Sequence, residues 1–349
     1  MSRFRVGITP DFLDERGELS FGDIDIGLGL LTEAGLAHEF LAENSSELRA
    51  DQIQGYDALL VLAPRISRQT LEGGDRLAVV ARFGVGYDTV DVEACTDAGI
   101  AVTITPDGVR RPVALAALTL ILALAHRLPA KDRLVREHRW AEKLRYMGVG
   151  ITGGTLGVVG FGNIGQELCR LARGLDLRPI AHDPYRSAEE AARLGVELVD
   201  LEQLLRRSDF VSVCCALAPE TRHLINAQRL ALMKPSAFLI NVARGPIVDG
   251  AALADALRAG HLRGAGIDVF DPEPPLPEDP LLALDNVILS PHALCWTDEC
   301  FSGNGRQACQ SIVDVAQGRP PRIVVDGRVL DSAPFRAKLA AYAGGVSQP

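Results

Sequence analysis

Three glycines, Gly160, Gly162 and Gly165, stand in the spacing G-x-G-x-x-G directly after an apolar run and directly before a helical pattern. This feature constrains the fold most, because a tight turn between a strand and a helix needs residues without a side chain. The first glycine permits the turn, the second admits a phosphate close to the backbone, and the third lets helix and strand pack closely. The helix N-terminus, with Asn163 and Ile164 in its first turn, would face that phosphate. The segment therefore predicts a dinucleotide-binding turn.

An aspartate follows the next apolar run of the chain. The run RPIAH ends directly before Asp183, which lies 18 residues beyond Gly165. An acid at about this distance from a glycine turn bonds the hydroxyls of the adenosine ribose. Its charge would also repel a 2′-phosphate, so we expect NAD rather than NADP, although Arg186 leaves some use of NADP open. The alternative is a glycine-rich turn beside an ordinary surface acid, which leaves the order of strand, turn, helix and acid unexplained.

Short apolar runs alternate with helical stretches over most of the 349 residues. This alternation predicts parallel sheets that helices cover on both faces. A chain of this length also exceeds the usual size of one hydrophobic core. We therefore expect an α/β protein with two doubly wound parallel-sheet domains. The predicted strands of the first domain are 4–8, 58–62, 77–81 and 100–104, and those of the second start at Thr155 and continue at 178–183, 210–215, 237–243, 264–270 and 287–289.

Proline and glycine in the segment 105–108 interrupt this pattern where the first series of strands ends. We expect the chain to cross into its second domain here and to return through a helical stretch at about 297–317. The apolar run 113–125 after the crossing is well short of the ~20 residues that span a bilayer. It predicts a helix that is buried or faces another subunit, and through it a homodimer. Arg110 and Arg111 before this run either reach an anionic group of a ligand or form a solvated helix start.

Charge and cysteine content narrow the class of partner and the compartment. The formal net charge is −9 and the isoelectric point lies near 5.4, which opposes binding to a nucleic-acid backbone. The seven cysteines include no C-x-x-C pair, and their odd number argues against a disulfide framework. Histidine and cysteine show no metal-ligand spacing, so we expect no metal. With no signal-peptide pattern at the N-terminus, these features indicate a cytoplasmic protein without nucleic-acid or membrane partners.

Three strings of the second domain place a charged or titratable residue after a predicted strand. They are NVARGPIVD with Arg244, GAGIDVFDPEP with Glu273, and SPH with His292. The carboxyl ends of parallel strands meet at one edge of a sheet, where doubly wound sheets bind ligands. An imidazole titrates near working pH, a carboxylate on its other nitrogen would orient it, and a guanidinium binds a carboxylate with two parallel hydrogen bonds. Each residue alone is more often structural, but their joint occurrence after the glycine turn predicts an acid/base site.

These strings, together with RFGVGYDTVD in the first domain, resemble the motifs of the D-isomer-specific 2-hydroxyacid dehydrogenase family. The resemblance runs from about residue 55 to about residue 315, and the motifs occur in the family's order. It implies that Arg244 binds the substrate carboxylate, that Glu273 orients the ring of His292, and that His292 is the acid/base. It also implies cofactor contacts at Ala243 and Asp268 and an anion-binding backbone loop at Gly84, Val85 and Gly86.

The same resemblance implies a fold and a reaction. Residues 106–293 would form a Rossmann NAD-binding domain, inserted into a flavodoxin-like substrate domain made of residues 1–105 and 294–349. The expected reaction is NAD-dependent hydride transfer between nicotinamide and a small D-2-hydroxyacid or 2-oxo acid. The hydride chemistry belongs to the cofactor, and the protein supplies position and electrostatics.

Two segments depart from the family pattern. The long helix has Leu115 where the family often has an acid, and Leu294, Cys295 and Trp296 follow His292 where small residues are common. We expect this second segment to project apolar groups close to the reacting carbon. Trp296 would line the substrate pocket with its apolar surface and its N–H donor, or it would pack at the hinge between the domains.

Two other functions are compatible with this pattern. A nicotinamide-sensing regulator, similar to the C-terminal-binding corepressors, would share the fold and the three polar residues. The lack of a basic patch and of long disordered tails argues against it. An enzyme that oxidises a one-centre anion, such as formate or phosphite, is the second alternative. Glu273 argues against the formate type, which resembles this pattern with glutamine in place of the acid.

Overall fold

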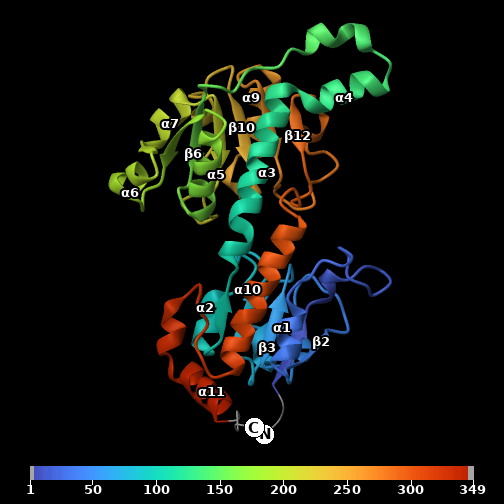
Figure 1. Ribbon diagram of the computed structural model, residues 1–349, viewed down its shortest axis with the longest axis vertical. Coiled ribbons are helices and arrows are strands. Elements are labelled where there is room, and N and C mark those ends of the chain that lie inside the picture. Colours follow the sequence, from blue (N-terminus) through green and yellow to red (C-terminus); the bar gives the residue numbers. More distant parts are fainter. Residues whose placement is uncertain (1–3, 345–349) are drawn as a thin grey trace. The chain divides into compact units, whose positions relative to one another are not determined.

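The chain forms two parallel sheets. The computed structural model describes residues 4–344. One unit consists of two segments, the chain up to Val109 and the chain from Thr297 onward. The other unit consists of Arg110–Trp296. These limits lie a few residues beyond the boundaries at 105 and 293 that we expect from the sequence. Each unit is an α/β domain with a parallel sheet (Figure 1), which confirms the predicted fold class.

The first unit is built from β1 (Arg5–Ile8), α1 (Leu28–Glu33), β2 (Ala37–Phe40), β3 (Ala58–Val61), β4 (Val79–Arg82), α2 (Val92–Asp97), β5 (Ala101–Thr103), α10 (Asp298–Ala316) and α11 (Ala333–Ala343). Its five strands pair in the order β2-β1-β3-β4-β5. This is the flavodoxin-like order, in which the chain reverses direction across the sheet between β1 and β3. Helix α10 contacts α1, β3 and β4, so a helix from the C-terminal part of the chain completes this domain.

The second unit is built from most of α3 (Pro106–His126) and from α4 (Leu128–Arg136), β6 (Thr155–Val159), α5 (Asn163–Arg173), β7 (Arg178–His182), α6 (Ala188–Arg193), β8 (Glu197–Leu198), α7 (Leu201–Arg207), β9 (Phe210–Val213), α8 (Ala227–Leu230), β10 (Phe238–Asn241), α9 (Gly250–Arg258), β11 (Gly264–Ile267) and β12 (Val287–Leu289). Its strands pair in the order β12-β11-β10-β9-β6-β7-β8. Counted within the unit, this is the Rossmann order 3-2-1-4-5-6 with one further strand at the β12 edge.

Helices cover both faces of the second sheet. Buried side chains of α3, α5 and α6 form one apolar cluster with the sheet, and those of α7, α8 and α9 form another. The strands are buried on both sides, as in β9 and β10, where all four residues of each are buried. Because both faces are covered, polar side chains at the ends of these strands are left to form a site at the sheet edge.

Helix α3 is longer than the apolar run from which we predict it. It has 21 residues, and by length and composition alone it is long enough to cross a membrane. In the structure 67% of its most apolar 18-residue window is buried, and Leu120 packs on Gly266 of β11. This is the position of a core helix, so α3 does not offer the wholly apolar free face on which we base the expected dimer. Leu115, one of the departures from the family pattern, lies on its partly exposed side.

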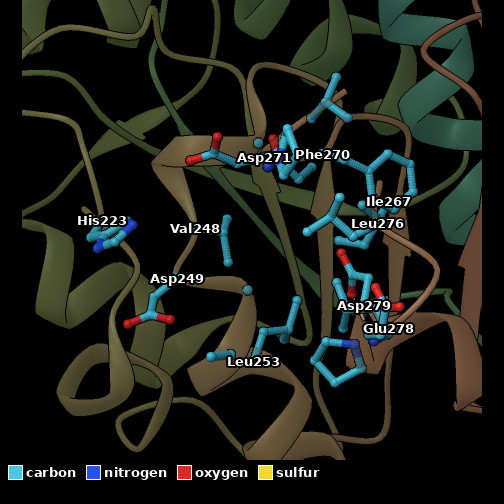
Figure 2. Close-up of a pocket in the computed structure, with 18 residues that line it drawn as sticks. His223, Val248, Asp249, Leu253, Ile267, Phe270, Asp271, Leu276, Glu278 and Asp279 are labelled. Atoms are coloured by element: carbon cyan, nitrogen blue, oxygen red, sulfur yellow. Dashed lines mark hydrogen bonds between the residues drawn. The ribbon is translucent and has the colours of Figure 1, made fainter. Parts of the chain in front are cut away.

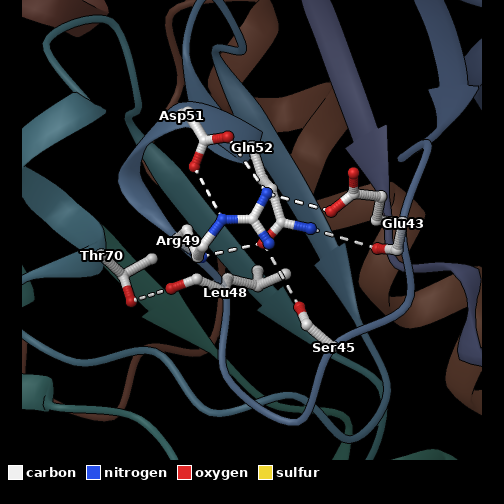
Figure 3. A network of polar contacts seen from close by, with 7 residues as sticks. All are labelled: Glu43, Ser45, Leu48, Arg49, Asp51, Gln52 and Thr70. Carbon is white, nitrogen blue, oxygen red and sulfur yellow. Dashed lines mark hydrogen bonds and ion pairs between the residues drawn. The ribbon is translucent and has the colours of Figure 1, made fainter.

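A network of polar contacts fixes the chain between β2 and β3 in the first unit (Figure 3). Arg49 donates hydrogen bonds to Asp51 and Glu43, both at 3.0 Å. These pairs are exposed and contribute little to stability. Oγ1 of Thr70, which is buried, donates to the backbone oxygen of Leu48 at 2.5 Å. The hydrogen bond of the Thr70 hydroxyl is therefore better shielded from water than the ion pairs of Arg49.

Candidate active site

The glycine turn lies between β6 and α5. Gly160 has a φ of 97°, and a Cβ there would lie 2.5 Å from the backbone nitrogen of Cys215. A Cβ on Gly165 would lie 2.2 Å from the backbone oxygen of Gly160. At Gly162, the N-cap of α5, a Cβ would meet nothing within 4 Å, so this glycine leaves open space beside the helix N-terminus. The turn thus has the shape that a pyrophosphate needs, and Asn163 and Ile164 follow it in the first turn of the helix.

Asp183 directly follows β7, the strand beside β6. Its Oδ2 accepts the N–H of Phe161 at 2.8 Å, and its Oδ1 accepts the N–H of Tyr185 at 2.9 Å. The carboxylate is therefore held against the glycine turn, where it carries the charge that we expect to exclude a 2′-phosphate. A carboxylate oxygen accepts more than one hydrogen bond, so both oxygens retain capacity for ribose hydroxyls.

Arg244, Glu273 and His292 lie in the loops that follow β10, β11 and β12, which are consecutive neighbours in the sheet. Nδ1 of His292 lies 2.7 Å from Oε2 of Glu273. Oε1 of Glu273 accepts the N–H of Phe270 at 2.9 Å. Burial raises the pKa of Glu273, but the hydrogen bonds from His292 and Phe270 and the charge of Arg244 bring it below its ordinary value. The structure thus brings the three residues of the predicted triad together.

Arg244 sits on a turn that contacts the loop carrying Glu273. A Cβ on Gly245 would lie 2.0 Å from the backbone oxygen of Phe270, so the two loops meet backbone to backbone. Nη1 of Arg244 donates to the backbone oxygen of Ala243 at 2.8 Å, which directs the side chain back along its own turn. Only glycine at position 245 permits this close approach, and it fixes the spacing of two triad loops.

Asn241, at the end of β10, is a residue that the sequence motifs do not single out. Its side chain donates to the backbone oxygen of Arg244 at 3.0 Å and accepts the N–H of Ala243 at 3.1 Å. It is buried, so these two bonds shape the Arg244 turn from inside. An asparagine at the end of an apolar strand, as in the string FLIN, is the signal that would have drawn attention to it.

Asp268 has a partner that the sequence does not reveal. Its carboxylate is buried, and Oδ1 accepts the N–H groups of Ala293 and Leu294, both at 3.2 Å. These two residues follow His292, whose φ of 54° is unusual for a residue with a side chain. Asp268 therefore stabilises the turn that carries His292, and any contact with nicotinamide would come in addition.

Leu294 departs from our expectation. It is partly buried and packs against the apolar cluster of α3, α5 and α6, whereas we expected it to project toward the reacting carbon. The hydrogen bond from its N–H to Asp268 explains this, because it turns the chain back onto the sheet. Trp296 at the end of the unit is 54% exposed.

Arg111 pairs with Glu167 of α5 at 3.2 Å, which favours the structural alternative for that arginine.

The loop 84–86 of the first unit follows β4, at the carboxyl edge of its sheet. The N–H of Gly84 already donates to Oγ1 of Thr105 at 2.8 Å. Gly84 therefore does not offer the anion-binding N–H that we predict for it, whereas Val85 and Gly86 remain as donors. Its role is to shape the loop, since its φ of 130° favours a residue without a side chain.

A cavity of about 390 Å³ lies beside the triad loops in the second unit (Figure 2). Its walls include Gly245, Phe270 and Asp271, which are the neighbours of Arg244 and Glu273, but not the triad residues themselves. In Figure 2 His223 and Asp249 lie on one side of it and Glu278 and Asp279 on the other. The cavity is thus lined by parts of the loops that carry Arg244 and Glu273.

The glycine turn, Asp183 and the triad at one sheet edge define the class of this protein, an NAD-binding α/β oxidoreductase. Comparison with known proteins narrows the class. Residues 118–293 match the family described as "D-isomer specific 2-hydroxyacid dehydrogenase, NAD binding domain". The chain belongs to this family and is an NAD-dependent enzyme.

Individual relatives agree with this assignment. A glyoxylate reductase from Thermococcus onnurineus (strain NA1) is 39% identical over 296 residues, covering 83% of this chain and 88% of the relative. A D-3-phosphoglycerate dehydrogenase from Archaeoglobus fulgidus is 36% identical over 302 residues, covering 86% of this chain but 57% of the relative. The crystal structure of a D-lactate dehydrogenase from Aquifex aeolicus, complexed with NAD and lactic acid, has a TM-score of 0.76 at 25% identity and covers 90% of this chain and 96% of that one.

Proposed function

We propose that the chain transfers a hydride between NAD and a small D-2-hydroxyacid or its 2-oxo acid, with His292 as acid/base, Glu273 orienting it and Arg244 binding the carboxylate. The observation that carries this proposal is the 2.7 Å hydrogen bond between Nδ1 of His292 and Oε2 of Glu273. It occupies one ring nitrogen and leaves Nε2 for the substrate.

Reduction of a 2-oxo acid builds negative charge on the carbonyl oxygen. Nε2 of His292 donates the proton to this oxygen, and the carboxylate of Glu273 stabilises the imidazolium before the transfer. The nicotinamide, when bound, supplies the hydride. The guanidinium of Arg244 binds the carboxylate with two parallel hydrogen bonds and polarises the adjacent carbonyl.

We assign the cofactor to the unit Arg110–Trp296, and in the other unit we propose that the N–H groups of Val85 and Gly86 bind a carboxylate. In the cofactor unit the proposed contacts are Gly160, Gly162, Asn163, Ile164, Gly165, Asp183, Ala243 and Asp268. Relatives named glyoxylate reductase favour a short 2-oxo acid as the substrate. These relatives and the D-3-phosphoglycerate dehydrogenase are named as enzymes and give no support to a regulatory role.

A panel of 2-oxo acids of increasing chain length, assayed by the loss of NADH absorbance, tests this function. We expect turnover of at least one short member. His292→Asn should lower turnover by about a hundredfold to ten-thousandfold while the dissociation constant of NADH changes little, because the acid/base is lost and the cofactor site is kept. Wild-type turnover in this variant would remove His292 from the mechanism.

We also propose a homodimer, through a different surface from the one that the sequence favours. Helix α4 and the following turn of 3-10 helix, Trp140–Tyr146, project from the rest of their unit (Figure 1). No residue of Trp140–Tyr146 is buried, and Leu144 is 76% exposed. Trp140 and Met147 are also largely exposed. An exposed apolar segment of this kind gains stability when a second copy covers it.

A cytoplasmic location is part of the same proposal. All seven cysteines lie among the described residues, and none of them forms a disulfide. Four of them, Cys95, Cys169, Cys300 and Cys309, are buried and behave as small apolar residues. A reducing compartment supports this state.

A further inference from the structure

A threonine side chain holds the backbone of Gly84 in the first unit. The N–H of Gly84 donates to Oγ1 of Thr105 at 2.8 Å, and the carbonyl oxygen of Gly84 accepts the N–H of Thr105 at 2.9 Å. The N–H belongs to the Phe83–Gly84 peptide and the carbonyl to the Gly84–Val85 peptide, so the two bonds hold the peptide groups on both sides of the Gly84 Cα. Because the loop 84–86 starts at these two peptide groups, its direction depends on Thr105.

Asn304 of α10 holds Thr105 in turn. Oγ1 of Thr105 donates to Oδ1 of Asn304 at 2.7 Å, so the hydroxyl accepts one bond and donates another. Thr105 is 1% exposed and Asn304 is 4% exposed. A Cβ on Gly108 would lie 2.4 Å from Oδ1 of Asn304, so glycine at 108 leaves just the room that the carboxamide needs.

A buried asparagine within a helix is unfavourable, because its helix propensity is low and its amide loses water. An apolar residue at position 304 would avoid that cost. Nδ2 of Asn304 donates to Sγ of Cys300 at 3.5 Å, and its Oδ1 accepts the proton of the Thr105 hydroxyl, which leaves that hydroxyl oxygen to accept the N–H of Gly84. The two side chains therefore act in series on the Phe83–Gly84 peptide, from which the loop 84–86 continues.

We propose that Thr105 and Asn304 are positioning residues for the carboxylate of the substrate. By holding Gly84 they direct the N–H groups of Val85 and Gly86, which have no hydrogen-bond partner within residues 4–344. Thr105 and Asn304 act through Gly84. The inference rests on the proposed function, since it takes this loop to bind the carboxylate.

Steady-state kinetics of four variants tests the inference. Thr105→Val should raise the KM for the best 2-oxo acid by about tenfold and change kcat by less than about threefold, because it removes a bond that places the N–H donors. Asn304→Leu should raise KM by roughly threefold to tenfold. Thr105→Ser keeps the hydroxyl and should have a KM close to that of the wild type. The double variant Thr105→Val/Asn304→Leu should resemble Thr105→Val alone, because residues acting in series are not additive.

Thr70→Val is the matched control, since it removes another buried threonine hydroxyl of the same unit. It should lower the melting temperature and leave KM unchanged. A Thr105→Val enzyme with wild-type KM, or a double variant in which the two effects multiply, would overturn the inference.

Binding of oxamate in the presence of NADH separates this inference from the proposed function. If the wild type reduces no 2-oxo acid, the proposed function fails, and calorimetry with oxamate decides about the loop. Weaker oxamate binding by Thr105→Val than by Thr70→Val would support the positioning role. Equal binding by the two variants, or no binding by the wild type, would overturn it.

Discussion

His292 and Glu273 are joined by a 2.7 Å hydrogen bond between Nδ1 and Oε2, and the other oxygen of Glu273 accepts the N–H of Phe270. The carboxylate is held at both oxygens, so it fixes the plane of the imidazole. Burial raises the pKa of Glu273, yet the hydrogen bonds from His292 and Phe270 bring it below its ordinary value. Glu273 is therefore charged at neutral pH, and a variant without this charge should differ measurably from the wild type at that pH.

Glu273→Gln should lower kcat less than His292→Asn does and should move the pH profile of 2-oxo acid reduction toward lower pH. The amide keeps a hydrogen-bonding group beside Nδ1 but no longer balances the charge of the imidazolium. The profile of kcat/KM against pH for both enzymes measures the shift. Superimposable profiles would mean that the two side chains do not interact during turnover.

The same carboxylate makes stability depend on pH in a definite direction. A group whose pKa is lower in the folded than in the unfolded state stabilises the fold above its unfolded pKa, and this contribution is lost as pH falls through the folded pKa. The melting temperatures of wild type and Glu273→Gln should differ most near neutral pH and converge in acid, as pH falls through the lowered folded-state pKa of Glu273. A gap that widens in acid would contradict this assignment.

Asp183 should set the choice of cofactor. Asp183→Ala should weaken NADH binding by roughly tenfold to a hundredfold, because it removes hydrogen bonds to the ribose. It should also reduce the preference for NADH over NADPH, because it removes the negative charge that repels the 2′-phosphate. Since Asp183 also accepts the N–H of Phe161, Asp183→Asn is the informative companion: it keeps an acceptor there and removes the charge. Dissociation constants of both nucleotides, measured by fluorescence, provide the comparison. If the unmodified protein already prefers NADPH, the cofactor assignment is wrong.

The projecting segment of α4 and Trp140–Tyr146 should determine the oligomeric state. Leu144→Asp places a charge in the proposed interface of each subunit, and at micromolar concentration it should convert a dimer into a monomer. Leu194→Asp makes the same change at another exposed leucine and should leave the dimer intact. Sedimentation of the three proteins decides the matter. A wild-type monomer would exclude the dimer altogether.

The strands that the sequence predicts are those with apolar runs, because burial on both faces of a parallel sheet requires them. Two edge strands escaped this reasoning. β2 has the sequence AHEF, and β8 consists of Glu197 and Leu198. An edge strand is paired on one side alone and tolerates polar residues, so its sequence resembles a loop.

The site divides in the same way. Arg244, Glu273 and His292 could be predicted because each is a polar residue directly after a strand, in strings with few other interpretations. The bonds of Asp268 to Ala293 and Leu294, and of Gly84 to Thr105, could not, since they depend on how a loop folds back. Such contacts join residues about 20 or more apart, and no local pattern encodes them.

The last prediction concerns Trp296, which is 54% exposed and follows the turn that carries His292. If its indole lines the substrate pocket, Trp296→Ala should change the ranking of 2-oxo acids by chain length. Bulkier substrates should gain about tenfold relative to the shortest, because one methylene of pocket is worth about 1 to 3 kcal/mol of discrimination. The melting temperature should change little, since Trp296 is largely exposed. The kcat/KM values of the panel, measured with the dissociation constant of NADH, give the answer. A uniform loss across all chain lengths, accompanied by a lower melting temperature, would show instead that Trp296 is a packing residue, because truncation of a buried aromatic side chain lowers stability without favouring one substrate.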